Sequence, residues 1–254
     1  MTLVTNRSSQ NSEVSEIQLR SPQINGFLSL YLARVLTARP GVKYSPMKPA
    51  AIGVRVHSGW GALVAVTQRN GAEEIIDRQK ITIIDPKSAG AMQPYHYAEP
   101  MALAAAEKHI ARCAADSSRL ALQALTQLAT QLRDRGFAVI GAAIVLSSAR
   151  PLPPLEKILS AHPLIHTAEG EFFRHAFRTA FERLRIPMTG IRERDLEDHA
   201  RKTFGRAATS VLNRLDSAGR TLGPPWTKDQ KTAALAAAIV LAQTSGAKSQ
   251  TSAQ

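Results

Sequence analysis

Residues 51–68 read AIGVRVHSGWGALVAVTQ, in which two apolar, β-branched runs flank a short turn. The turn contains His57, Ser58 and Trp60, together with glycines that suit a tight reversal of the chain. Runs of this kind, separated by so few residues, are typical of two antiparallel strands. The stretch therefore predicts a β-hairpin at the start of the folded part of the chain.

A third strand is predicted directly after this hairpin. Asn70 and Gly71 form a dipeptide that strongly favours a two-residue turn between antiparallel strands. Residues 73–85 follow as EEIIDRQKITIID, which carries enough β-branched residues for a strand. Three early strands joined by tight turns predict an antiparallel meander.

Helices and strands then alternate along the chain. Residues 137–146, FAVIGAAIVL, are a near-continuous apolar run, which is typical of a central strand covered on both faces. A second, shorter strand is predicted at 188–193, MTGIRE. Apolar spacing and capping residues predict the helices, which cover about 99–114, 116–136, a short segment ending near 162, 167–184, 195–215 and 227–243. This order favours an α/β fold with a mixed sheet flanked by helices.

Composition limits the class of protein. The chain has 254 residues, of which 44% are hydrophobic and 20% charged, as in ordinary globular proteins. Its single cysteine, Cys113, excludes a disulfide framework and a cysteine-based zinc cage. No apolar run reaches the roughly 18 residues that a membrane span needs. We expect a cytoplasmic protein with a disordered or loosely docked segment at 1–48, one domain at 49–244 and a disordered tail at 245–254.

The formal net charge is +12, from 32 Lys and Arg against 20 Asp and Glu. About a third of the excess, +4, falls in residues 1–48, and residues 49–244 carry +7. A basic balance favours polyanionic partners such as DNA or RNA, although a modest excess also simply keeps proteins soluble. The apolar segment 27–35 offers a different interaction, the docking of a protein partner or of a second copy of the chain.

The element order over residues 50–243 resembles the ribonuclease H-like fold and, within it, the branch of RuvC-type resolvases. The similarity is most specific at IGVRVHSGWGALVAV and at Asp229 with TAALAAAIVLA after it. It implies a mixed five-stranded sheet, a three-stranded antiparallel meander followed by α-β-α-β, flanked by helices. In these proteins, carboxylates at the end of the first strand, near the fourth strand and on the closing helix bind divalent metal. The resemblance therefore implies Mg or Mn and phosphodiester hydrolysis.

The chain departs from that pattern at the end of the first strand, where Val54 and Arg55 stand near the expected aspartate. A guanidinium would repel a metal ion, but it can hold a phosphate or a carboxylate through two parallel hydrogen bonds. If the protein is catalytic, we expect Glu169 and Asp229 to be the catalytic and metal-binding carboxylates. The alternative for Glu169 is an ordinary acid in the first turn of a helix.

His57 is a candidate general base, since an unperturbed imidazole titrates near neutral pH. A turn histidine bonded to backbone is the alternative. Ligands of open α/β sheets bind where the carboxyl ends of parallel strands meet. We predict phosphate or anion contacts there from Arg55, Ser58, Arg150, Arg192 and Lys228. The same mixture of charges would also suit a salt-bridge network that closes the sheet edge.

Two further patterns have less specific readings. His162, His166 and Glu169 have the spacing H-x-x-x-H-x-x-E, which superficially resembles a zinc motif. Because Pro163 disfavours one regular helix through both histidines, we expect loop histidines with a structural role. The aromatic cluster Tyr95, His96 and Tyr97 is predicted either to stack on bases or to pack as a loop lid.

These patterns lead to two hypotheses of different classes. The first is a nucleic-acid-binding protein of ribonuclease H-like fold, with divalent-metal-dependent phosphodiester hydrolysis left open. The second is a catalytically inactive protein-interaction or structural module.

Overall fold

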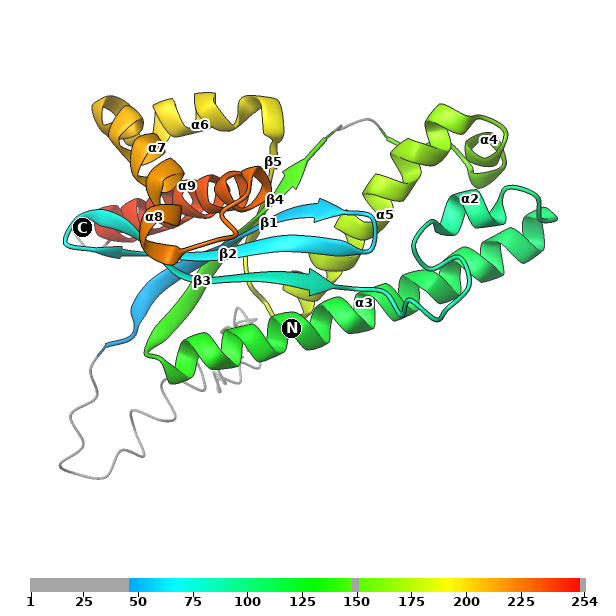
Figure 1. Cartoon of the computed structure of the whole chain (residues 1–254), viewed down its shortest axis with the longest axis horizontal. Helices are drawn as coiled ribbons and strands as arrows, with labels where there is room; N and C mark the ends of the chain where they lie inside the picture. The colour runs from blue at the N-terminus through cyan, green and yellow to red at the C-terminus, as the bar shows by residue number, and fades with distance from the viewer. Residues whose placement is uncertain (1–45, 148–150, 252–254) are drawn as a thin grey trace, which may run out of the picture. The chain divides into compact units, whose positions relative to one another are not determined.

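The computed structural model describes residues 46–147 and 151–251. Its strands form a five-stranded sheet in the order β3-β2-β1-β4-β5 (Figure 1). Antiparallel pairing joins β1 (Lys48–His57), β2 (Trp60–Arg69) and β3 (Ala72–Thr82), whereas β4 (Phe137–Leu146) lies parallel to β1 and β5 (Met188–Arg192) parallel to β4. The predicted fold class, a meander followed by α-β-α-β in a mixed sheet, is confirmed.

The two predicted turns have the geometry that their residues suggest. His57 pairs with Trp60 across the first turn, and Gly59 takes a φ of 78° there. Asn70 and Gly71 both have positive φ, 53° and 76°, which is the combination that a tight hairpin turn requires. The short connections set the pairing next to each turn, and the register of β2 with β3 then shifts between Ala65 and Val66.

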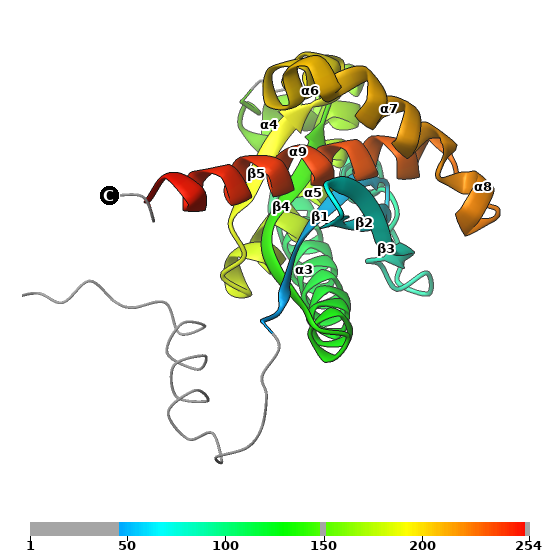
Figure 2. The ribbon, with the colours of Figure 1, turned by 90° about the vertical axis from the view of Figure 1, so that its left-hand side faces the viewer.

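Helices cover both faces of the sheet. They are α2 (Pro94–Ala98), α3 (Leu103–Asp134), α4 (Leu155–Leu159), α5 (His162–Arg183), α6 (Leu196–Phe204), α7 (Ala208–Ser217), α8 (Gly219–Leu222) and α9 (Lys228–Thr251). Helices α3 and α5 lie on one face, and α6, α7 and α9 lie on the other (Figures 1 and 2).

Several predicted helix boundaries were wrong. One helix, α3, runs through Asp116, because a residue that can cap a helix does not end one when helix formers continue on both sides. The predicted basic helix at 195–215 is broken at Gly205, whose φ is 53°. Helix α9 continues past the predicted end at 243 to Thr251.

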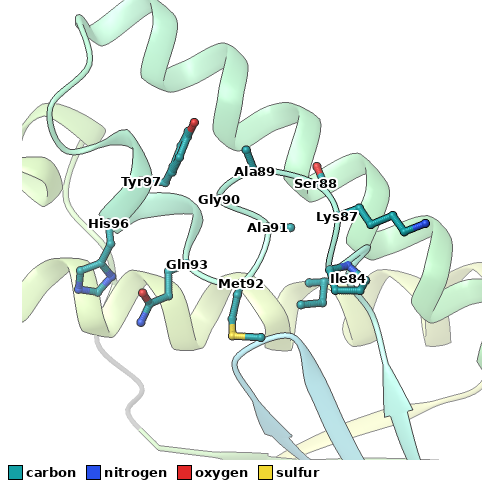
Figure 3. A pocket seen from close by; sticks show the side chains of 11 residues that line it. Ile84, Lys87, Ser88, Ala89, Gly90, Ala91, Met92, Gln93, His96 and Tyr97 are labelled. Carbon is teal, nitrogen blue, oxygen red and sulfur yellow. The ribbon is translucent and has the colours of Figure 1, made fainter.

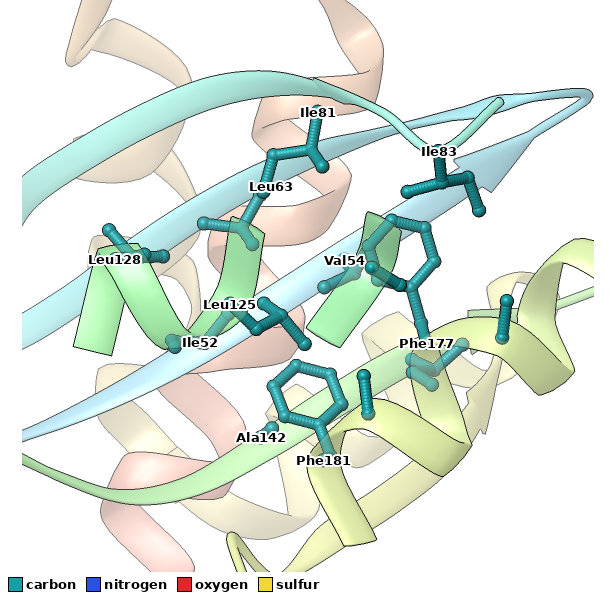
Figure 4. Packing of buried hydrophobic residues seen from close by; sticks show 14 of the residues in the cluster. Ile52, Val54, Leu63, Ile81, Ile83, Leu125, Leu128, Ala142, Phe177 and Phe181 are labelled. Carbon is teal, nitrogen blue, oxygen red and sulfur yellow. The ribbon is translucent and has the colours of Figure 1, made fainter. Parts of the chain in front are cut away.

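Each face of the sheet has its own core. Ile52, Val54 and Leu63 point toward α3 and α5, where they meet Leu125 and Phe177 (Figure 4). On the other face, the small residues of α9 allow an unusually close approach to β1. A Cβ added at Gly53 would lie 1.9 Å from the carbonyl oxygen of Ala233. This contact sets the position of the start of α9 over the end of β1.

The structure does not test two predictions about the N-terminal part of the chain. The predicted leader at 1–48 and the docking segment at 27–35 lie largely or wholly outside the described residues. Within the described parts of the chain, no helix has the length and apolar character needed to cross a membrane.

Candidate functional site

The side chains at the end of β1 that face the start of α9 are set by the alternation of side chains along a strand. Gly53 touches Ala233 on the α9 face, so Arg55 and His57, two and four residues later, point to the same face. Asp229 lies four residues before Ala233, which is about one helical turn. Packing of the glycine against the helix therefore brings Asp229 to Arg55 and His57.

Arg55 is the centre of this site. Its Nη2 donates a hydrogen bond of 2.8 Å to Oε2 of Glu193, the residue that follows β5. Its Nη1 lies 3.4 Å from Oδ1 of Asp229. The Arg55 side chain is 22% exposed, against 35% for Glu193 and 27% for Asp229. One half-buried guanidinium is thus held by two carboxylates, and we refer to Arg55, His57, Glu193 and Asp229 as the Arg55 cluster.

His57 can complete this cluster in two ways. Its Nε2 lies 3.1 Å from Oδ2 of Asp229 and 3.1 Å from Nη1 of Arg55. With a proton on Nε2, the ring donates to Asp229, whereas without one it accepts from Arg55, so only one of these bonds forms at a time. The ring stacks on Trp60 at a centroid distance of 4.3 Å, and Nζ of Lys80 lies 4.4 Å from the centre of the indole. Among the described residues, the polar contacts of the His57 ring are therefore with the side chains of Arg55 and Asp229. The alternative prediction was a hydrogen bond from this histidine to backbone.

Further cations lie on the segments that supply the cluster, at the end of β5, directly after it and at the start of α9. Lys228 is 85% exposed at the side chain and lies 3.8 Å from Glu193. Arg192 and Arg194 both pair with Asp195, at 2.5 and 3.6 Å, and Arg194 is 74% exposed. Counted together, the ends of β1 and β5 and the start of α9 carry four cations and three carboxylates. Glu193 links Arg55 to Lys228, whereas Arg192 pairs with Asp195, and the binding of phosphate by these cations remains a prediction.

The other predicted anion contacts have less support. Ser58 is exposed in the turn between β1 and β2, and Arg150 lies outside the described residues.

The site does not fit the pair of hard cations that the resemblance implies. Two such ions need several oxygen ligands to hold them. In the described parts of the chain, the carboxylates that contact Arg55 are those of Glu193 and Asp229, and the guanidinium already lies between them. A Mg or Mn pair would have to displace this internal cation.

Glu169 lies away from this edge, and the structure does not bring it together with Asp229, its predicted partner as a metal ligand. Its carboxylate turns toward α2, where Oε1 accepts backbone hydrogen bonds from Tyr95 (2.9 Å) and His96 (3.1 Å). The physical reason is that α5 and α9 cover opposite faces of the sheet (Figure 2). Burial raises the pKa of the Glu169 carboxyl, and the hydrogen bonds from His96 and Tyr95 only partly oppose that rise.

Pro163 does not separate His162 from His166. Helix α5 begins at His162 with the proline in its first turn, where the missing N–H costs nothing because it would have no intrahelical partner. The two histidines therefore share one regular helix, and the expectation of loop histidines was wrong. His96 on α2, which is not part of the H-x-x-x-H-x-x-E pattern, lies beside them. Potential metal-binding atoms of the three rings lie within 4.8 Å of one another. We call His96, His162 and His166 the three-histidine cluster.

A pocket of about 480 Å³ adjoins this cluster. The loop that follows Ile84 and the start of α2 line it, and His96 and Tyr97 stand at one end (Figure 3). Tyr95 packs edge-on against Phe172 and Tyr97 lies over His109, with centroids 6.1 and 4.8 Å apart. Both tyrosines therefore have partners within the protein, as a packed lid requires.

The strand order and directions are those that the resemblance implied. The mixed five-stranded sheet flanked by helices is thus the one expected of a ribonuclease H-like fold. No protein-family model and no curated protein matches the chain in sequence.

Similar solved structures include two of Thermus thermophilus RuvC. The one in complex with a Holliday junction substrate has 10% identity and a TM-score of 0.43, covering 75% of this chain and 91% of that chain. The other has 11% identity and a TM-score of 0.42, covering 78% and 96%. A yeast mitochondrial Holliday junction resolvase has 10% identity and a TM-score of 0.44, covering 87% of each chain. At these identities the likeness concerns the fold alone.

Proposed function

We propose that this protein binds nucleic acid through phosphate contacts at the edge formed by the ends of β1 and β5, and that it does not hydrolyse the strand there with a metal pair. The observation that carries the proposal is the position of the Arg55 guanidinium between Glu193 and Asp229. An internal cation stands where hard metal ions would need carboxylates.

Arg55 decides the sign of the charge at this edge. As the chain stands, Arg55, Arg192, Arg194 and Lys228 outnumber the carboxylates of Glu193, Asp195 and Asp229. With an aspartate at position 55, the carboxylates would outnumber the cations. A surface with an excess of arginine and lysine attracts phosphates directly, without a bridging metal ion.

The exposed cations are the ones available for binding. Lys228 and Arg194 have side chains 85% and 74% exposed, whereas Arg55 is largely engaged by its two carboxylates. We assign phosphate contact to Lys228, Arg194 and Arg192, and a positioning role to Arg55. The formal charge of +12 for the whole chain supports the same class of partner.

Binding of labelled DNA and RNA as a single strand, a duplex and a four-way junction tests the proposal. We expect the logarithm of the binding constant to fall steeply between about 50 and about 200 mM salt, because bound phosphates release counterions. The double variant Lys228→Ala/Arg194→Ala should bind about 10-fold more weakly, with a salt slope shallower by about 2.

The matched control is Lys108→Ala/Arg119→Ala, which removes two exposed cations from α3. It should bind like the wild type. Binding that ignores salt, or equal losses in both double variants, would contradict the assignment to the strand-end edge. Cleavage of a strand in Mg²⁺ or Mn²⁺ that Asp229→Asn abolishes would contradict the absence of hydrolysis.

A further inference from the structure

Three histidine side chains meet between α2 and the first two turns of α5. His162 and His166 stand four residues apart, which places them on one side of the helix, and His96 reaches them from α2. Edge-to-face contacts join all three rings, with centroids 4.5–5.3 Å apart. The three-histidine cluster has no role in the Arg55 cluster or in the phosphate contacts proposed above.

The ring nitrogens are close to the spacing that a metal ion requires. Nε2 of His162 and Nε2 of His166 are 3.0 Å apart. Tetrahedral Zn²⁺ with bonds of about 2.0–2.1 Å needs nitrogen ligands about 3.3 Å apart. Potential ligand atoms of all three histidines already lie within 4.8 Å of one another, and His162 and His166 are exposed. Small rotations of these two rings would bring the three nitrogens to the required spacing.

Glu169 holds His96 in a state that can bind a metal ion. This carboxylate is only 4% exposed, and its Oε1 lies 3.2 Å from Nδ1 of His96. A proton held on Nδ1 by the carboxylate leaves the lone pair of Nε2 free for a metal ion. A carboxylate behind a metal-binding histidine orients the ring and strengthens it as a ligand. Among the described residues, the second oxygen of Glu169 has no hydrogen-bond partner, so a dication nearby would offset the cost of burying its charge.

We propose that His96, His162 and His166 bind one late transition-metal dication, Zn²⁺ above all, and that Glu169 is a positioning residue for His96. Imidazole nitrogens suit Zn²⁺, Cu²⁺ and Ni²⁺, whereas Mg²⁺ and Ca²⁺ prefer oxygen ligands. Three protein ligands leave a fourth position on the metal for water or another small ligand. Because His96 also lines the neighbouring pocket, a small molecule in that pocket would lie beside the metal site.

Metal uptake by the full-length protein, prepared without a histidine tag, tests the site. After equilibrium dialysis against Zn²⁺, elemental analysis should find one equivalent bound. Co²⁺ should give the visible absorption of a low-symmetry nitrogen site, and Zn²⁺ should displace it. At a free Zn²⁺ concentration 100-fold above Kd, the unfolding temperature should rise by about 5–10 °C.

Single-ligand variants locate the metal. His162→Ala and His166→Ala change exposed side chains, so both should fold, and each should weaken Zn²⁺ binding by at least 100-fold. The matched control is His175→Ala, an exposed histidine on the same helix outside the cluster, which should keep wild-type affinity. Substoichiometric uptake by the wild type, or wild-type affinity in His162→Ala, overturns the metal site and shows that the histidines only bond to each other.

Glu169→Gln separates positioning from mere support of the fold. The amide oxygen can still accept the backbone hydrogen bonds of Tyr95 and His96, so the variant keeps the local structure. We expect Zn²⁺ binding to weaken about 10–100-fold and the Co²⁺ spectrum to shift, with little change in the unfolding midpoint in a chelator. A lowered midpoint in the chelator with unchanged Zn²⁺ affinity overturns the positioning role.

Discussion

The Arg55 cluster and the three-histidine cluster both join residues that are distant in the chain, but they differ in what stands at their centres. In the Arg55 cluster, two carboxylates form ion pairs with one guanidinium of the same chain. In the three-histidine cluster, nitrogen atoms with lone pairs converge, and one buried carboxylate stands behind them. The strand-end edge thus carries a cation of the protein itself, whereas the contact between α2 and α5 carries the histidines proposed above as metal ligands.

The comparison shows that a single residue, Arg55, sets the character of the strand-end edge. In the sheet, β4 lies between β1 and β5, parallel to both. The Arg55 guanidinium at the end of β1 places a positive charge between two carboxylates. In the function proposed above, these carboxylates hold the guanidinium and are not metal ligands.

Reversing that residue should have the largest effect. Arg55→Asp would leave three carboxylates close together without the guanidinium that now lies between Glu193 and Asp229, and we expect the free energy of unfolding to fall by about 2–4 kcal/mol. Mg²⁺ or Mn²⁺ should restore part of this loss, because three carboxylates suit a hard cation. Urea unfolding with and without the metal measures both effects.

Arg55→Lys is the control for this experiment, since it keeps the charge and loses the two-pronged hydrogen bonding. It should lose about 1 kcal/mol and gain no response to metal. If Arg55→Asp is as stable as the wild type, or if Mg²⁺ stabilises the wild type equally, the guanidinium is not what keeps metal out.

Separating β1 from α9 should break one cluster and spare the other. A Cβ at Gly53 would lie 1.9 Å from a backbone oxygen of α9, so Gly53→Ala must push the helix away and should cost about 2–3 kcal/mol. Nucleic-acid binding should weaken as Asp229 and Lys228 shift, whereas Zn²⁺ uptake at the three-histidine cluster should not change. Urea unfolding and the two binding assays measure these effects.

Gly141→Ala serves for comparison, because its Cβ would meet a methyl group of Val240 at 2.7 Å and not backbone. A side chain can move aside, so this variant should lose less stability, about 1 kcal/mol. Equal losses of stability in the two variants would contradict the importance of the backbone contact at Gly53. Loss of Zn²⁺ uptake in Gly53→Ala would mean that the two clusters are coupled.

The smallest expected effect concerns a buried histidine beside the pocket. Burial, with a smaller contribution from Arg112, lowers the pKa of His109. The unfolded chain therefore binds a proton more readily than the folded one, so this contribution to stability is present above the unfolded pKa and is lost as the pH falls below it. The unfolding midpoint measured between pH 7 and pH 5 in a chelator should decline less steeply in His109→Gln than in the wild type. An unchanged pH profile in His109→Gln would contradict this contribution of His109.

Local patterns predicted the sheet well and the helix boundaries poorly. The hairpin at residues 51–68 and the turn at Asn70 were recognisable because a strand repeats every two residues and a tight turn needs particular backbone angles. Asp116 and Pro163 misled, since each has a local preference that depends on its place in a helix. A proline in the first turn and an aspartate in mid-helix are both tolerated when the surrounding residues favour the helix.

The local spacing of residues fixes which side chains share a face of a strand or helix. Packing between strands and helices then fixes which of those side chains come into contact. Alternation along β1 commits Arg55 and His57 to the same face, and helical spacing commits His162 and His166 to one side of α5. Whether Glu169 or Glu193 joins Asp229, and whether His96 reaches α5, depends on how helices cross the two faces of the sheet. Those distances are set by side-chain packing between elements that are remote in the chain, such as Gly53 against α9, and no local period encodes them.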